Sequence, residues 1–204
     1  MNSADLDELL ERIESLPISG KRRVVAIAGP PASGKSWLAA QVSKRLKHAV
    51  TVPMDGYHLD NRVLEDRGLL ARKGAPETFD LGGFASLVKR LKQEEEIFFP
   101  LFDRARDLAI AGAGLVGRDC KSVIVEGNYL LYDRPGWRSL DRFWDLRVFL
   151  RPSETVLRER LIDRWLRHGL DRPAAIARAQ DNDLPNARAV SSNLTRLDVE
   201  ISSA

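Results

Sequence analysis

The sequence predicts an α/β fold in three layers, with a central, mainly parallel sheet between two layers of helices. Short apolar runs rich in valine and isoleucine recur along the chain, and such runs are typical of strands that are buried on both faces. Segments with apolar residues at helical spacing separate these runs. Because strands that are joined through helices pair in parallel, the alternation predicts a parallel sheet with helices on both sides.

The expected elements can be placed along the chain. The apolar runs predict strands at residues 23–28, 49–54, 122–126 and 146–150. The helical patterns predict helices at residues 3–16, 35–47, 81–92 and 153–168, the last capped by Ser153, and Pro173 is expected to open another. Residues 57–75 are expected to hold a short helix and a loop, residues 97–117 short strands or an excursion over the sheet edge, and residues 189–201 one or two strands.

Length and composition are those of an ordinary globular protein. The chain has 204 residues, of which 44% are hydrophobic and 30% charged, and this size fits a single domain over residues 1–204. No run approaches the roughly 18 apolar residues of a membrane helix, and the acidic start of the chain lacks the layout of a signal peptide. Cys120 is the only cysteine, so no intrachain disulfide can form. These features predict a cytoplasmic protein without a membrane partner.

The charge balance argues against a nucleic-acid-binding surface. Lysine and arginine outnumber aspartate and glutamate by only 32 to 29, and the two signs are interleaved along the chain. A broad nucleic-acid surface would need a basic stripe. The expected partner is therefore a small molecule, and both a monomer and a homodimer stay open as oligomeric states.

A phosphate-binding loop is the strongest functional signal in the sequence. Residues 29–36 (GPPASGKS) fit the pattern G-x-x-x-x-G-K-[ST] without departure, between a predicted buried strand and a predicted helix. The glycines permit backbone angles that turn successive N–H groups toward one anion at a helix N-terminus. Lys35 is expected to reach the β- and γ-phosphates of ATP, and the Ser36 hydroxyl to bind Mg²⁺. The residues expected to contact the nucleotide are Gly29, Pro31, Ala32, Ser33, Gly34, Lys35, Ser36 and Trp37. Trp37 is expected to pack in the core or beside the nucleotide.

Two acidic residues follow predicted strands and are expected at the same sheet edge as this loop. Asp55 ends the second strand, where a carboxylate could accept the proton of an attacking hydroxyl; an ordinary Asp-Gly turn explains the same residues equally well. Glu126 ends the third strand, where a P-loop protein is expected to carry an acid that supports Mg²⁺; a solvated acid at a strand end is the alternative.

An arginine-rich segment has two interpretations. Arg160, Arg164 and Arg167 share one face of the predicted helix at residues 153–168. An arginine that closes over the γ-phosphate would stabilise the charge of the transition state. An exposed helix with ion pairs at i, i+4 spacing, such as Asp163 with Arg167, is the competing explanation.

Taken together, residues 24–190 resemble the phosphoribulokinase, uridine kinase and pantothenate kinase group of P-loop kinases. Residues 54–58 (MDGYH) resemble the D-G-F-H signature of that group, in which the aspartate is the catalytic base. Residues 72–80 (RKGAPETFD) are similar to a pantothenate kinase segment, and residues 100–104 (PLFDR) stand where the group carries a substrate-contacting motif. Residues 125–131 (VEGNYLL) correspond to its E-G motif, and the arginine-rich helix, followed by residues 181–186 (DNDLPN), corresponds to its lid.

The resemblance implies an ATP- and Mg²⁺-dependent kinase with a P-loop NTPase fold and a lid at about residues 153–185. It implies that the catalytic residues are Asp55, Lys35, Arg160 and Arg164. It implies that the acceptor contacts are Tyr57, His58, Lys73, Asp103 and Arg104. Ser36 and Glu126 would bind the metal.

The acceptor itself stays open at this point. A subgroup of bacterial proteins that carry the name fructose transport system kinase shares G-A-P-E-T-F-D, P-x-F-D-R, E-G-N-Y-L-L and N-D-x-P-N-A with this chain, which makes a sugar such as fructose one candidate. Specificity like that of pantothenate or uridine kinases is the alternative, although the chain is much shorter than pantothenate kinases and has Arg104 where they usually carry a histidine. A nucleotide-binding regulator without a metabolite substrate is the third interpretation.

Overall fold

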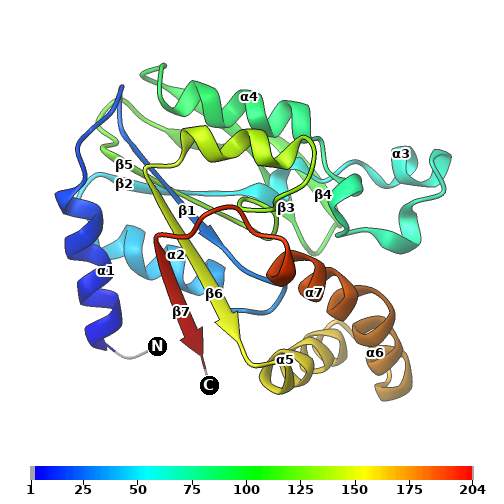
Figure 1. Ribbon diagram of the computed structural model, residues 1–204. Coiled ribbons are helices and arrows are strands. Elements are labelled where there is room, and N and C mark those ends of the chain that lie inside the picture. The colour runs from blue at the N-terminus through cyan, green and yellow to red at the C-terminus, as the bar shows by residue number, and fades with distance from the viewer. Residues whose placement is uncertain (1–2, 204) are drawn as a thin grey trace.

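A parallel sheet forms the centre of the molecule. The computed structural model describes residues 3–203, and within them five strands pair in the order β2-β5-β1-β6-β7, each parallel to its neighbours. The strands are β1 (Arg23–Ala28), β2 (Ala49–Pro53), β5 (Ser122–Gly127), β6 (Leu146–Pro152) and β7 (Val199–Ser203). Helices cover both faces of the sheet (Figure 1), so the predicted three-layer α/β/α fold is confirmed.

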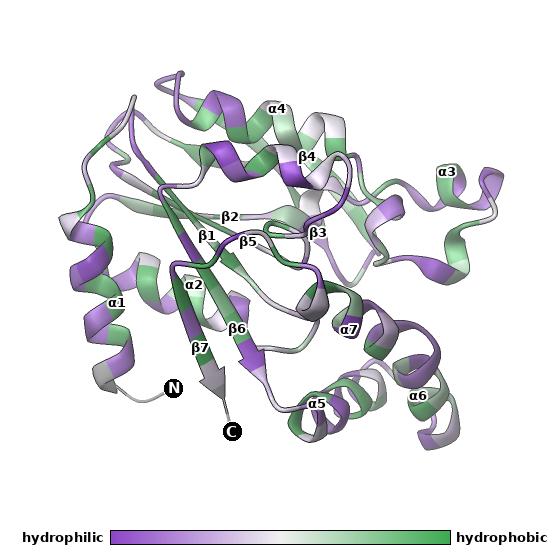
Figure 2. Ribbon diagram, in the orientation of Figure 1, coloured by the Kyte–Doolittle hydropathy of each residue, from purple (hydrophilic) through white to green (hydrophobic). Residues whose placement is uncertain are grey.

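The two faces of the sheet bury different sets of side chains. Val25 and Ile27 of β1 belong to the core on one face, whereas Val24, Ala26 and Ala28 belong to the core on the other. Figure 2 shows the consequence, since the middle parts of the central strands are coloured mainly as hydrophobic. The helices that cover the first core are α1 (Ser3–Ser15) and α2 (Lys35–Arg45). The second core is covered by α4 (Leu81–Leu91) and a 3₁₀ turn at Trp137–Phe143.

A separate hairpin stands beside the sheet. It consists of β3 (Ile97–Asp103) and β4 (Leu108–Val116), which pair antiparallel with an irregularity between Phe99 and Leu101. Strands were expected in this part of the chain and are present, but with seven and nine residues they are not short. The hairpin packs against the 3₁₀ turn Met54–Tyr57, and the short helix α3 (Asn61–Asp66) follows that turn.

Gly56 is required where the hairpin meets the turn after β2. A Cβ atom at this position would lie only 2.1 Å from the carbonyl oxygen of Pro100. The backbone of β3 thus passes directly over the turn that carries Asp55. The Asp-Gly pair is part of this contact between the sheet edge and the hairpin.

Gly56→Ala is expected to destabilise the protein by about 1–3 kcal/mol, because the added methyl group must displace the β3 backbone. Urea unfolding followed by circular dichroism measures this change. Gly82→Ala is the matched control, since a Cβ there would lie 3.7 Å from its nearest neighbour, an oxygen of Asp80. Equal stability of the two variants would contradict the close approach.

Three helices gather at the carboxyl ends of the strands. They are α5 (Glu154–Arg167), α6 (Arg172–Arg178) and α7 (Leu184–Ser192), with a π-helical turn at Ala179–Asp183 between the last two (Figure 1). Ser153 caps α5 as expected by accepting a hydrogen bond from the backbone N–H of Val156, and Pro173 lies in the first turn of α6. Within residues 3–203, no helix has both the length and the apolar character needed to cross a bilayer.

The end of the chain differs from the sequence prediction. Instead of one or two strands over residues 189–201, helix α7 continues to Ser192 and only β7 is a strand. Leu184, Ala187 and Val190 are buried at a spacing of three residues, which places them on one side of a helix. The segment predicted to hold strands began at residue 189, inside this helix, so it contained too few of the helix's residues to show the helical spacing.

Candidate active site

The phosphate loop, residues 29–36, connects β1 to α2 in a curled conformation. Gly34 has φ +96° and Ala32 has φ +61°, both in the left-handed region, and α2 begins directly afterwards at Lys35. A Cβ at position 29 would lie 2.7 Å from the Ser33 hydroxyl oxygen and 3.1 Å from the carbonyl oxygen of Leu150, so glycine is needed there. Left-handed residues at a helix N-terminus form the backbone nest that binds phosphate.

A buried hydroxyl in this loop also fits an anion. The Ser33 side chain is 2% exposed, and its hydroxyl oxygen has no hydrogen-bond partner within the part of the chain that the structure describes. A buried polar group without a partner costs free energy unless a ligand satisfies it. The loop therefore offers a backbone nest and an unused donor for a phosphate group.

The strand order brings three positions to one edge of the sheet. Because β5 lies between β2 and β1, the residues that follow these strands are neighbours. Glu126 pairs in register with Pro53 of β2 on one side and with Ile27 of β1 on the other. Asp55, two residues beyond Pro53, therefore lies at the same carboxyl edge as the phosphate loop.

Glu126 provides a carboxylate suited to a divalent cation. The residue is 5% exposed, and the Ser36 hydroxyl donates a hydrogen bond to it. Burial raises the pKa of Glu126, while the nearby charge of Lys35 lowers it and so opposes the effect of burial. Hydroxyl and carboxylate oxygens are the ligands that Mg²⁺ prefers, so Ser36 and Glu126 fit such an ion. No cluster of three or more histidine, cysteine or acidic side chains that could hold a metal occurs within residues 3–203.

Lys35 lies among the charged groups of this edge. Its Nζ is 3.5 Å from the carbonyl oxygen of Pro30, within its own loop. Burial lowers the pKa of Lys35, and the charges of Glu126 and Asp55 act in the opposite direction. The ammonium group is thus placed where it can turn from its own loop to an anion that enters the nest.

Asp55 is kept ionised by its surroundings. Its carboxylate forms an ion pair with the guanidinium of Arg104, the first residue after β3. Burial would raise the pKa of Asp55, but the charge and hydrogen bond of Arg104 and the charge of Lys35 oppose burial, and the pKa lies below its usual value. At neutral pH Asp55 is therefore a carboxylate that can accept a proton. Arg104 remains half exposed, with N–H groups open to solvent.

His58 is held beside Asp55 by one hydrogen bond and by contacts with two aromatic rings. Its Nδ1–H donates to the backbone carbonyl of Asp55 at 2.8 Å. The ring centroid lies 4.1 Å from that of Phe79 and 4.8 Å from that of Phe102. Burial lowers the pKa of His58, so the ring is neutral at pH 7.

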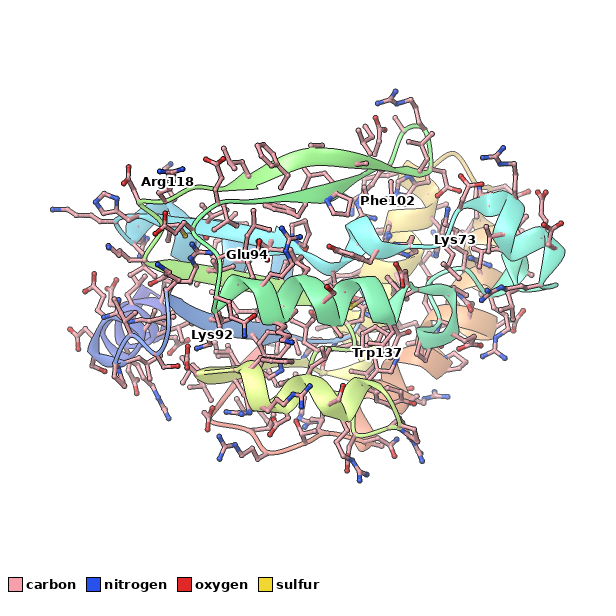
Figure 3. All side chains as sticks on the ribbon, turned by 90° about the horizontal axis from the view of Figure 1, so that it is seen from above. Lys73, Lys92, Glu94, Phe102, Arg118 and Trp137 are labelled. Atoms are coloured by element: carbon pink, nitrogen blue, oxygen red, sulfur yellow. The ribbon has the colours of Figure 1, made fainter. Side chains whose placement is uncertain are left out.

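Lys73 ties the acceptor-side segment to the hairpin. Its ammonium group donates to the side chain of Asn61 at 2.6 Å and pairs with Asp107 at 2.9 Å. It also lies 5.1 Å from the ring centroid of Phe102. Figure 3 labels both residues, with Phe102 on the hairpin. These contacts hold the hairpin, and with it Arg104, over the turn that carries Asp55.

Two expected acceptor contacts face other partners. The Tyr57 ring packs against Phe84 of α4 with ring centroids 5.3 Å apart, and burial raises its pKa to about 12. Asp103 accepts hydrogen bonds from backbone N–H groups of the hairpin turn and pairs with Arg106. The structure does not bring either side chain to Asp55.

The arginines of α5 differ in their surroundings. Arg164 is partly buried, and burial together with the charge of Arg104 lowers its pKa; its charge in turn acts on Lys35 and Asp55. Arg160, one turn earlier, forms no ion pair or side-chain hydrogen bond within residues 3–203. The structure thus brings Arg164, and not Arg160, into the cluster around the phosphate loop.

Trp37 projects outward from the first turn of α2. Its side chain is 57% exposed, so the expectation of core packing is wrong. A position beside a bound nucleotide remains a prediction.

Trp165, Arg178 and Asp183 lie next to Arg164, and sequence reasoning did not select them as site residues. The Trp165 indole N–H donates to the carboxylate of Asp183, which is buried. The motif at residues 181–186 contained the available signal, but the sequence does not show which of its residues faces α5.

A nucleotide-binding loop with an acid, a lysine and an arginine around it defines the chain as a P-loop kinase. Residues 24–177 match the phosphoribulokinase/uridine kinase family, and the chain belongs to this family.

Several proteins of known structure or sequence are similar to this chain. A putative fructose transport system kinase from Silicibacter sp. TM1040, known from a crystal structure, is 51% identical in sequence to this chain. The two structures superpose over 98% of each chain with a TM-score of 0.91. Protein YggC of Escherichia coli K12 is 39% identical over 85% of this chain and 74% of its own. A putative uridine kinase of Schizosaccharomyces pombe is 33% identical over 95% of this chain and 88% of its own. A pantothenate kinase of Nocardioides sp. is 30% identical, and this chain spans about half of its length (48%).

Proposed function

We propose that the protein transfers the γ-phosphoryl group of ATP to a hydroxyl group of a small metabolite. The observation that carries this proposal is the convergence of Lys35, Asp55 and Glu126 at one sheet edge, beside a phosphate loop. A nucleotide-binding regulator has no need of an ionised acid on the acceptor side of such a loop. In this chain the surroundings of Asp55 keep it ionised beside the phosphate loop, paired with the guanidinium of Arg104.

The roles of the residues follow from their placement. The backbone N–H groups of the phosphate loop hold the phosphates, and Lys35 spreads the negative charge of the transferred group. Asp55 accepts the proton of the attacking hydroxyl, while Arg164 adds positive charge from the lid. Phosphoryl transfer depends mainly on positioning and electrostatics, and these residues supply both.

Ser36 and Glu126 would hold Mg²⁺ beside the phosphates. The ion would supply positive charge that neutralises phosphate oxygens as the transferred group moves. Ionisation of Glu126 is then coupled to metal binding, because only the carboxylate is a good ligand.

The lid in this proposal comprises residues 153–185, within a single kinase domain of residues 1–204. The helices α5 and α6 of this segment lie at the carboxyl ends of the strands, next to the phosphate loop (Figure 1). Their closure would exclude water, which would otherwise hydrolyse ATP.

The acceptor side is formed by His58, Lys73 and Arg104. A sugar such as fructose is one candidate, because the Silicibacter relative carries that name and is 51% identical. Uridine and pantothenate are the alternatives from the names of more distant relatives.

A screen of ATP consumption over sugars, nucleosides, pantothenate and hydroxy acids tests the proposed function. Turnover with one class of acceptor, absent in a Lys35→Ala protein, is the expected result. Stabilisation by nucleotide in a thermal-shift assay, with no phosphorylated product across the panel, would point to a regulator instead.

Arg104→Ala is expected to move the acid limb of the kcat profile to higher pH. Arg104 helps to hold the pKa of Asp55 below its usual value, so removal of the guanidinium raises that pKa. Since Asp55 must be ionised to accept a proton, activity is then lost at a less acidic pH. The profile is measured at saturating Mg²⁺, ATP and acceptor, so that ionisation of Glu126 does not limit the rate.

Arg106→Ala is the matched control for this measurement, because Arg106 is exposed in the same turn and pairs with Asp103. An acid limb at the same pH in the Arg104 variant and the wild type would show that Asp55 is not the group that titrates.

A further inference from the structure

A buried acid in the lid, Asp183, has no direct role in the proposed phosphoryl transfer. Asp183 lies in the π-helical turn between α6 and α7 and is 8% exposed. Its Oδ2 accepts a hydrogen bond from the Trp165 indole N–H at 2.5 Å. Burial raises the pKa of Asp183, and the Trp165 hydrogen bond and the charge of Arg164 act against burial. A buried acid is costly, so its retention calls for a compensating use.

Trp165 connects this acid to two arginines. The Arg164 guanidinium carbon lies 5.8 Å from the centroid of the Trp165 ring, and the Arg178 guanidinium carbon lies 5.2 Å from it. Both distances are within the range of cation–π attraction. The indole of Trp165 thus donates a hydrogen bond to Asp183, while its ring lies beside the guanidinium groups of Arg164 and Arg178.

Arg178 carries the connection to the acceptor side. Its guanidinium donates to the backbone carbonyls of Ala71 at 2.7 Å and Lys73 at 3.4 Å. The Lys73 side chain in turn pairs with Asp107 at the turn of the hairpin. A continuous set of contacts therefore runs from the lid to the segment around Lys73 and on to the hairpin.

Arg164 needs such a support because two other cations lie near it. Arg104 and Lys35 both repel its guanidinium, and this repulsion would favour rotation of the side chain into solvent. The attractive groups are the charge of Asp183 and the Trp165 ring on the lid side and, more weakly, the charge of Asp55 in the site. Their combined pull opposes the repulsion in the absence of nucleotide.

We propose that Trp165 and Asp183 are positioning residues that hold Arg164 toward the γ-phosphate site, with Arg178 joining this support to the acceptor-side segment. The inference rests on the proposed function, since it assigns Arg164 to a triphosphate. Arg164 would then be in place before ATP binds. Preorganisation of this kind strengthens binding of the γ-phosphate, and binding of a diphosphate gains nothing from it.

Isothermal titration calorimetry with Mg²⁺ and either a non-hydrolysable ATP analogue or ADP tests this inference without a known acceptor. Arg164→Ala is expected to lower the preference for the triphosphate over ADP by about tenfold or more, as expected for a charged hydrogen bond. Trp165→Phe, which removes the indole N–H, and Asp183→Asn, which removes the negative charge, are each expected to lower it by about threefold to tenfold. Affinity for ADP should stay the same.

A double variant separates positioning from general weakening of the fold. In the Arg164→Ala background, Trp165→Phe is expected to cause no further loss of the preference, because its effect passes through Arg164. Trp144→Phe is the matched control: its indole N–H donates to the carbonyl of Leu130 at 3.1 Å, in the core far from the lid. This variant should lower the melting temperature and leave the preference unchanged.

Several outcomes would overturn the inference. One is an unchanged preference for the triphosphate over ADP in Trp165→Phe and Asp183→Asn. Another is a double variant in which Trp165→Phe lowers this preference as much as it does in the wild-type background. These results leave the proposed function standing. If instead the preference falls as expected but no acceptor is phosphorylated in the metabolite screen, the positioning role holds and the proposed function fails.

Discussion

Asp55→Asn is expected to lower kcat with the true acceptor by about 10²-fold or more, while affinity for ATP stays the same. Asparagine has almost the same shape as aspartate but cannot take the proton from the acceptor hydroxyl. Residue 55 lies just after β2, and Glu126 separates it from the phosphate loop. The substitution therefore leaves the contacts of the loop with the nucleotide intact. Steady-state rates at saturating acceptor, together with calorimetric titration of ATP, measure the two effects separately.

Asp66→Asn is the matched control for this variant. Asp66 is exposed at the end of α3, in the same part of the chain but outside the sheet edge. Its substitution should change neither kcat nor ATP affinity. Full turnover in Asp55→Asn would show that another group accepts the proton, or that the reaction needs no general base.

Lys35→Ala is expected to lower kcat by about 10²- to 10³-fold, the range found when one group that stabilises transition-state charge is removed. Lys35 is the cation of the phosphate loop, and the acidic groups around it, Glu126 and Asp55, cannot replace its charge. Because the charge on the transferred group changes most in the transition state, kcat should fall more than ATP affinity.

Lys44→Ala provides the comparison, since Lys44 is exposed in the last turn of the same helix, α2. Rates within about twofold of the wild type are expected there, as for ordinary surface substitutions. If Lys35→Ala retained wild-type turnover, the loop would not serve phosphoryl transfer and the proposed function would be wrong.

Local sequence patterns were sufficient for most of the elements around the site. The strands β1, β5 and β6 contain short apolar runs that are buried on both faces, and the edge strand β2 has a similar run that is only partly buried. The phosphate loop likewise depends on consecutive residues, because its conformation is set by glycine and by the helix that follows. Patterns of this kind need no information from distant parts of the chain.

Predictions failed where the pattern was short or the partner was distant. The helix α7 is nine residues long and buries only small or aliphatic side chains, so its period was not distinguished from that of a strand. Tyr57 follows Asp55 by two residues, yet it turns into the core against Phe84. Which way such a side chain points depends on what packs against the turn, and this is absent from the local sequence.

The sequence alone determined the chemistry that is available: a phosphate loop, an acid after each of two strands and an arginine-rich helix. Only the tertiary structure decided which of these groups meet. The strand order puts Glu126 between the phosphate loop and Asp55, the hairpin brings Arg104 onto Asp55, and the lid brings the charge of Arg164 close to Lys35 and Asp55. The physical reason is that these contacts join residues far apart in the chain, where packing of the whole fold, and not local propensity, sets distance and direction.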